Sequence, residues 1–188
     1  MPEPIENIIS KCRRGDPNAF ERLVDEYQVF AYALAFRLLG RSDEASDVAQ
    51  EAFIRVWKNI SRMDESRKFS TWLYRIVVNL CYDVLKRRKR REAIFVHNED
   101  HSEFACGKDI EEDIHQQETV HAVLQLTARL PLKQRMVFIL RDIQDVDIAD
   151  VAEILSMSAR SVCSNLYHAR SWIREKLKEM EKHEVQEN

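Results

Sequence analysis

The C-terminal stretch IADVAEIL (148–155), SMS (156–158) and ARSVCSNLYHAR (159–170) decides the architecture of this half of the chain. Apolar residues recur every three to four positions on both sides of a short polar break, which predicts two helices joined by a tight turn. Ala152 is small enough for a close helix crossing, and Val162 would pack back on the first helix. This is the layout of a helix-turn-helix, whose second helix, here Ala159 to about Met180, enters the major groove of DNA.

Polar side chains dominate the outward face of that second helix. Ser158 is placed to cap its first turn, where unpaired amides can also meet a phosphate. Arg170 and Arg174 suit contacts to the DNA backbone. A plain helical hairpin with a polar face remains the alternative. The residues that could hydrogen-bond base edges or phosphates are Arg160, Ser161, Ser164, Asn165 and His168.

A second signal is the run of six cations from Lys86 to Arg91, at the end of a helix predicted over 69–91. Such a run suits phosphates, although a solvated basic helix end is the alternative. The same helix carries a polar, aromatic stripe that could hold a single strand and an unstacked base. We interpret Trp72 as a core residue. The candidate nucleic-acid contacts on this helix are Arg75, Asn79, Asp83, Lys86, Arg87 and Arg90.

Helix signals also occur elsewhere in both halves of the chain. Asp16-Pro17 and Ser42 begin helices, Gly40 ends one, and Pro131 begins another at Leu132. The 188 residues include only three Gly and four Pro, which disfavours a turn-rich β architecture. The sequence therefore predicts an all-α protein.

Charge divides the chain into three parts. Residues 1–91 contain 18 Lys and Arg against 13 Asp and Glu, residues 92–118 contain one against nine, and residues 119–188 contain ten against ten. The middle part has no helical period and reads as a flexible acidic linker. We therefore predict two small helical domains, 1–91 and 119–188, joined by a linker over 92–118. Because local fields decide polyanion binding, the net charge of −3 does not exclude DNA.

Other function classes find no support in the sequence. No apolar run approaches the ~20 residues that span a bilayer, and residues 1–10 lack a signal core, so we expect a cytoplasmic protein without membrane insertion. Gly-rich phosphate loops, GxSxG and HExxH are absent, so no enzyme, cofactor or metal is expected. The four cysteines show no CxxC pair. A metal site from His97, His101, Cys106 and His115 would lack standard finger spacing.

Four segments, taken in order, resemble the extracytoplasmic-function (ECF) sigma factors of bacterial RNA polymerase. DVAQEAF (47–53) with RVW (55–57) resembles region 2.2, and FSTWLYRI (69–76) with Asn79 and Asp83 resembles regions 2.3 and 2.4. The stretch from Leu130 to Asp142 resembles the start of region 4, and the helix-turn-helix resembles region 4.2. The resemblance covers the chain from about Ile5 to Met180.

The resemblance implies roles for the candidate residues. The loop over 61–68, with the helix-69–91 residues named above, would melt and hold the −10 element, and the second helix of the helix-turn-helix would read the −35 element. The partners implied are core RNA polymerase, promoter DNA and an anti-sigma factor. The face that would dock on core RNA polymerase consists of Asp47, Gln50, Glu51 and Arg55.

Two departures from the family pattern bear on promoter choice. Family members often have Gly-Thr where this chain has Arg160-Ser161. The family usually has Lys or Arg where this chain has Cys163, Asn165 and His168, so the −35 helix of this chain is less basic.

A stand-alone helix-turn-helix regulator is the alternative function, but it would not need the basic helix over 69–91. A helical interaction module would need the docking face without the DNA-facing stripes.

Overall fold

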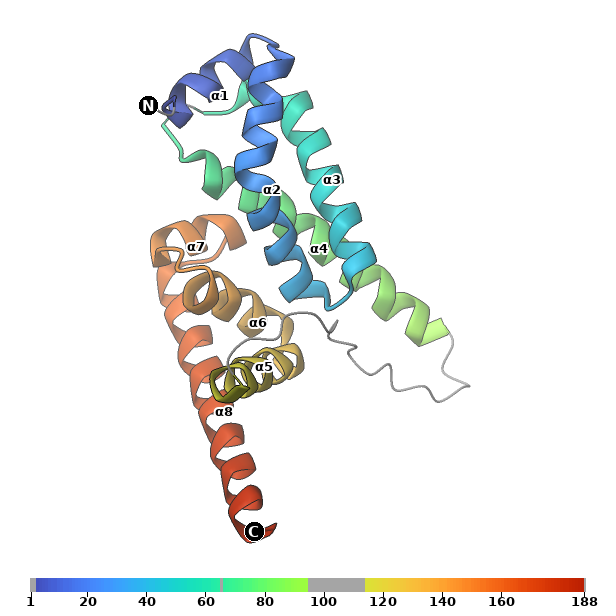
Figure 1. Ribbon diagram of the computed structural model, residues 1–188, viewed down its shortest axis with the longest axis vertical. Helices are drawn as coiled ribbons and strands as arrows, with labels where there is room; N and C mark the ends of the chain where they lie inside the picture. Colours follow the sequence, from blue (N-terminus) through green and yellow to red (C-terminus); the bar gives the residue numbers. More distant parts are fainter. Residues whose placement is uncertain (1–2, 65, 95–113, 188) are drawn as a thin grey trace. The chain divides into compact units, whose positions relative to one another are not determined.

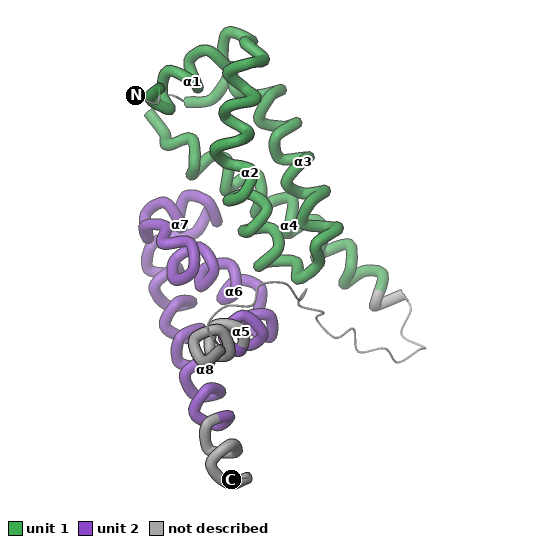
Figure 2. The backbone as a smooth tube through the Cα atoms, in the orientation of Figure 1, with its two compact units in different colours: residues 1–101 green, residues 102–188 purple. Residues whose placement is uncertain are grey.

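The structure, a computed structural model, describes residues 3–64, 66–94 and 114–187. Every regular element among these residues is a helix, which confirms the all-α prediction (Figure 1). They belong to two compact units, residues 1–101 and 102–188 (Figure 2).

The first unit is built around α2, which contacts the three other helices of this unit. Its elements are α1 (Ile5–Arg13), α2 (Pro17–Leu39), α3 (Ser42–Asn59), η1 (Ile60–Arg62) and α4 (Phe69–Ile94). Burial of a large aliphatic side chain contributes about 1.5–3 kcal/mol, so the apolar stripes hold the unit together. The largest fully buried side chains here are Leu23, Leu34, Leu38, Leu39, Val56, Ile60, Leu73 and Val77.

Local sequence signals set the ends of α2. The Asp16 carboxylate accepts hydrogen bonds from the amides of Asn18 (2.9 Å) and Ala19 (3.2 Å), and Pro17 occupies the first turn. Gly40 ends the helix in the left-handed conformation, with φ 71°, and its amide donates to the Phe36 carbonyl. Both ends confirm the sequence-based expectation.

The segment over 61–68, expected to be a loop, begins inside the short 3-10 helix η1. Met63 in this segment is buried, so it anchors the loop to the core. The side chain and amide of Ser66 both donate to the Asp64 carboxylate, at 2.7 and 3.0 Å. These hydrogen bonds lower the pKa of Asp64. Asp64 and Ser66 are thus held together by their own polar groups.

The second unit is built around α8, which packs against α5, α6 and α7. Pro131 precedes α6 as expected, and Ile139 and Leu140 are fully buried in the π-helical turn η2. The turn between α7 and α8 confirms the helix-turn-helix. The elements are α5 (Ile114–Arg129), α6 (Leu132–Phe138), η2 (Ile139–Ile143), α7 (Ile148–Leu155) and α8 (Ala159–Glu187).

Three helix ends differ from the sequence-based expectation. Helix α8 continues past Met180 to Glu187. Helix α4 continues past Arg91 to Ile94, and α5 begins at Ile114 rather than near Thr119. The predicted linker over 92–118 therefore includes helical residues at both ends. An acidic composition without an apolar period hides such helix ends, because they form by continuing a turn begun elsewhere. The rest of that prediction lies at 95–113, outside the described residues.

Candidate nucleic-acid interface and protein-binding face

The outer face of α3 brings together the four residues predicted to dock on a protein. Asp47, Gln50 and Arg55 are exposed and Glu51 is half-buried. The Arg55 Nε donates to the Glu51 Oε1 at 2.9 Å, one helical turn away. Sequence reasoning missed Ile54, which lies among these polar residues with 47% of its surface exposed. An apolar side chain inside a polar rim is typical of a protein-binding face.

The polar stripe of α4 is accessible along its length. Asn79, Asp83 and Tyr82 are exposed, and Arg75 is half-buried. Tyr82 leaves 47% of its surface in solvent, which suits stacking against an unpaired base. Trp72 is only half-buried, with its ring 6.0 Å from that of Phe69.

Tyr74, beside that stripe, interacts electrostatically with a cation that sequence reasoning did not find. Burial raises the pKa of Tyr74, and the positive charge of Arg37 on α2 lowers it in part. The same burial lowers the pKa of Arg37. The two residues lie on different helices and are 37 positions apart, so no local pattern could have paired them.

The six cations at the end of α4 have different surroundings. Five of them are exposed, namely Lys86, Arg87, Lys89, Arg90 and Arg91. Arg88 is half-buried: its Nε donates to the Glu44 Oε1 at 3.2 Å, its Nη2 pairs with the second oxygen of the same carboxylate, and its Nη1 donates to the Leu39 carbonyl at 3.1 Å. Arg88 therefore ties α4 to α3 and to the last carbonyl of α2.

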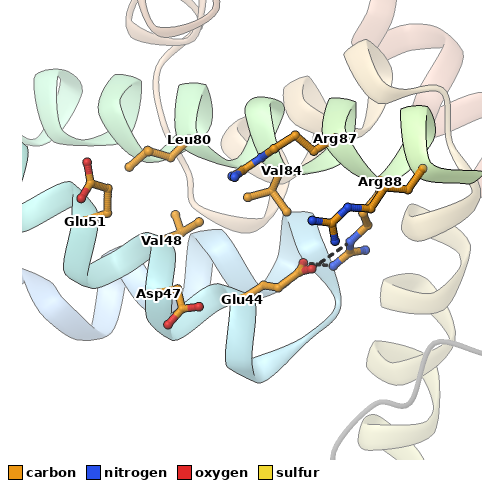
Figure 3. A pocket seen from close by; sticks show the side chains of 9 residues that line it. Glu44, Asp47, Val48, Glu51, Leu80, Val84, Arg87 and Arg88 are labelled. Atoms are coloured by element: carbon orange, nitrogen blue, oxygen red, sulfur yellow. Dashed lines mark hydrogen bonds and ion pairs between the residues drawn. The ribbon is translucent and has the colours of Figure 1, made fainter.

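A surface cleft of about 360 Å³ lies between α3 and α4, next to that ion pair (Figure 3). Leu80 and Val84 point into it from α4, and Val48 lies on the α3 side. Its charged lining combines both signs. The acidic lining residues are Glu44, Asp47 and Glu51, and the basic ones are Arg87, Arg88 and Arg91.

The second helix of the helix-turn-helix, α8, has the predicted cap. The Ser158 Oγ accepts a hydrogen bond from the Ser161 amide at 3.2 Å. Exposed side chains follow from the first turn onward, whereas Ser161 and Asn165 are half-buried and the Asn165 Nδ2 donates to the Ser161 carbonyl at 2.8 Å. The exposed predicted contacts are Arg160, Ser164, His168, Arg170 and Arg174.

Sequence reasoning missed Tyr167, although it is 70% exposed on the same helix. Its ring lies 5.6 Å from that of His168 in an edge-to-face arrangement. The helical spacing from Arg160 and Ser164 could have revealed it, because residues seven and three positions apart share a face.

Arg170 lies on the flank of α8 and binds a carboxylate of η2. Its Nε and Nη2 donate to the two oxygens of Asp142, at 2.7 and 2.5 Å. These hydrogen bonds raise the pKa of Arg170. A residue predicted for the DNA backbone thus has a protein partner in this structure.

Metal and membrane features are also absent from the part of the chain that the structure describes. No cluster of three or more His, Cys, Asp or Glu residues suited to a metal occurs among those residues. His97, His101 and Cys106 lie outside them. None of the described helices is long and apolar enough to cross a bilayer.

Both units match known protein families. Residues 23–91 match the family model described as Sigma-70 region 2, and residues 121–173 match Sigma-70, region 4. The chain is 34% identical over 183 residues to the ECF RNA polymerase sigma factor SigW of Bacillus subtilis, which covers 94% of this chain and 98% of that protein. It is 31% identical over 181 residues to the RNA polymerase sigma-H factor of Pseudomonas aeruginosa, covering 91% and 92%.

Two solved structures share the fold. CnrH, solved in complex with the cytosolic domain of CnrY, aligns with a TM-score of 0.67 and 22% identity over 92% of this chain and 96% of that chain. The sigma factor RpoE of Bartonella quintana, solved with the anti-sigma factor NepR, aligns with a TM-score of 0.72 and 21% identity over 85% and 96%.

Proposed function

This chain belongs to the extracytoplasmic-function (ECF) sigma factors of bacterial RNA polymerase, and from that premise we propose a role for each exposed face of its two units. As a sigma factor it binds core RNA polymerase, directs the enzyme to specific promoters and helps to melt the −10 element. It is a transcription initiation factor. A stand-alone helix-turn-helix regulator is not favoured, because the similarity to sigma factors includes both units.

The α3 face is our candidate for core polymerase. Asp47, Gln50, Glu51 and Arg55 offer hydrogen bonds and charge, and Ile54 adds apolar area in their midst. A polar rim around an apolar centre gives a docking face both orientation and affinity.

The α4 stripe is our candidate for the −10 element. Asn79 and Asp83 can hydrogen-bond the edge of an unstacked base, and Tyr82 offers a ring for stacking. Arg75, Lys86 and Arg90 line up with these residues at helical spacing and would neutralise nearby phosphates. The segment over 61–68 precedes this helix and would help to separate the strands.

The N-terminal part of α8 is our candidate for the −35 element. Ser158 caps the helix, and exposed side chains from Arg160 to His168 can reach base edges in the major groove. Arg174 is exposed further along and suits a phosphate. Ser161 and Asn165 are half-buried, so they would contribute less than their neighbours.

We also propose an anti-sigma partner and a cytoplasmic location. RpoE of Bartonella quintana was solved with an anti-sigma factor. Because this chain has a fold of the same kind, a comparable partner could bind its two units. RNA polymerase acts in the cytoplasm of bacteria, which supports a cytoplasmic location for its sigma factor. Affinity purification from resting cells that recovers polymerase subunits alone would count against the anti-sigma partner.

The observation that carries the promoter role is the capped α8 with its exposed polar face, in a chain that also carries the α4 stripe. Run-off transcription on genomic promoter fragments, with and without the protein, tests it. We expect new start sites that disappear in Asp47→Lys/Glu51→Lys, and Asn79→Ala to reduce open complexes more than closed ones. If polymerase starts nowhere new, the proposal fails.

A further inference from the structure

Helical geometry sorts the basic run of α4 onto two faces. At about 100° per residue, Lys86 and Arg90 lie on the side of Asn79 and Tyr82. Arg87 and Arg91 lie on the side of Leu80 and Val84, and line the cleft with them. The run therefore supplies cations to two different surfaces.

The cleft surface does not suit a phosphate chain. Its opposite wall carries Glu44, Asp47 and Glu51, so an entering phosphate would meet carboxylates as well as guanidinium groups. Like charges placed opposite each other at an interface cost several kcal/mol in general, which opposes DNA at this position. Lys86, Lys89 and Arg90 do not line the cleft, so its acidic wall does not oppose a phosphate bound to them.

The same lining suits an amphipathic protein helix. Val48, Leu80 and Val84 supply apolar contact, and the charged groups above them form walls of opposite sign. Arg88 and Glu44 neutralise each other across the cleft, whereas Asp47 and Arg91 have no ion-pair partner among the described residues. A helix with an apolar residue flanked by one basic and one acidic side would match these groups.

We propose that Arg87 and Arg91 belong to the interface with core RNA polymerase rather than to the DNA interface. A helical segment of core polymerase seats an apolar side chain over Leu80 and Val84, with its basic flank toward Asp47 and its acidic flank toward Arg91. The inference rests on the proposed role of the α3 face, because Asp47 and Glu51 belong to both surfaces. It reassigns Arg87, which the sequence places with the −10 contacts.

Equilibrium binding of fluorescently labelled full-length protein to core polymerase, without DNA, tests this. We expect Arg87→Glu/Arg91→Glu to weaken binding to core polymerase about tenfold or more, because the acidic flank of the polymerase helix would then meet negative charges on α4. Val84→Phe, which changes no charge, should also weaken binding by filling the apolar floor. The matched charge reversal Lys86→Glu/Arg90→Glu should change core affinity less than twofold while it weakens promoter binding by the holoenzyme. Circular dichroism melts verify folding, and Arg88 stays unchanged in all variants.

The outcomes separate two failures. If Asp47→Lys/Glu51→Lys weakens core binding but Arg87→Glu/Arg91→Glu and Val84→Phe do not, the α3 proposal stands and the cleft inference is wrong, even if another protein proves to bind there. If the Asp47→Lys/Glu51→Lys variant binds core polymerase normally, the α3 proposal itself fails. If Arg87→Glu/Arg91→Glu loses only promoter binding, the two arginines serve DNA.

Discussion

The guanidinium of Arg170 on α8 holds the carboxylate of Asp142 on η2 through two parallel hydrogen bonds of 2.7 and 2.5 Å. The pair joins the helix that carries the proposed −35 contacts to the turn that precedes the helix-turn-helix. It also places a negative charge beside a surface proposed to face phosphates. Asp142 and a DNA phosphate would therefore compete for the same guanidinium.

Removing that competition should strengthen DNA binding. We expect Asp142→Asn to bind promoter duplex about three- to tenfold more tightly, with a salt dependence steeper by about one counterion, because Arg170 becomes available to a phosphate. The cost in unfolding free energy should be about 1 kcal/mol, since Arg170 leaves 49% of its side chain in solvent although Asp142 leaves only 19%. Fluorescence anisotropy over a series of salt concentrations measures the promoter affinity and its salt dependence. Asp145→Asn, the same charge change at an exposed pair with Arg141, is the control; weaker binding by Asp142→Asn would show that the pair positions α8 instead.

Arg88 should matter for stability more than for DNA. Its partner Glu44 is half-buried and Leu39 is buried, so Arg88→Ala leaves a carboxylate and the last carbonyl of α2 without this donor. We expect a loss of about 1–3 kcal/mol in unfolding free energy, only partly recovered by Arg88→Lys, which lacks the planar fork. Urea unfolding followed by circular dichroism measures it. The exposed neighbour Arg90→Ala should leave stability within about 0.5 kcal/mol of wild type, and an equal loss at both positions would contradict this reading.

Asp145 adopts a left-handed backbone conformation, with φ 50°, in the turn before α7. Glycine adopts this conformation without steric cost, and the Asp145 carboxylate is too exposed for its pair with Arg141 to contribute much. We expect Asp145→Gly to stabilise the protein by about 0.5 kcal/mol and Asp145→Val to destabilise it by about 1–2 kcal/mol. Thermal unfolding compares the two, and destabilisation by both would show that the side chain itself is needed.

Thiol labelling should report on α8. Burial raises the pKa of Cys81 to about 12 and also raises that of Cys12, so at pH 8 both remain protonated as well as inaccessible. Cys163 is exposed. In a Cys106→Ser background, we expect one thiol to react rapidly and two only on unfolding. Because Cys163 lies beside the proposed −35 contacts, specific promoter duplex should slow its labelling while a scrambled duplex does not.

Local chemistry allowed most helix boundaries to be predicted. A cap at Asp16, a left-handed Gly40 and the break at Pro131 each act within one turn, so a single sequence carries the whole signal. The start of α5 at Ile114 was not predictable, because it lies in an acidic stretch without an apolar period. Met63 gave no periodic signal either, since it is a single buried residue within a polar loop.

The candidate sites divide in the same way. Exposure of the α8 face follows from helical spacing and was predictable, although Tyr167 was overlooked. The partners of Arg88 and Arg170 lie 44 and 28 positions away, and no local pattern encodes such pairs. Only the packing of α3 against α4 shows that Arg87 and Arg91 line a cleft with an acidic wall, whereas Lys86 and Arg90 of the same basic run do not.

The tie between Glu44 and Arg88 also limits how the chain can diverge. Lys86, Lys89 and Arg90 can exchange lysine for arginine with little consequence for a phosphate-facing surface, because each acts mainly as a positive charge. Position 88 has no such freedom, since a bidentate pair and a helix-end carbonyl both depend on its fork. Substitutions at positions 44 and 88 should therefore be accepted only in concert, as a pair that is inherited together.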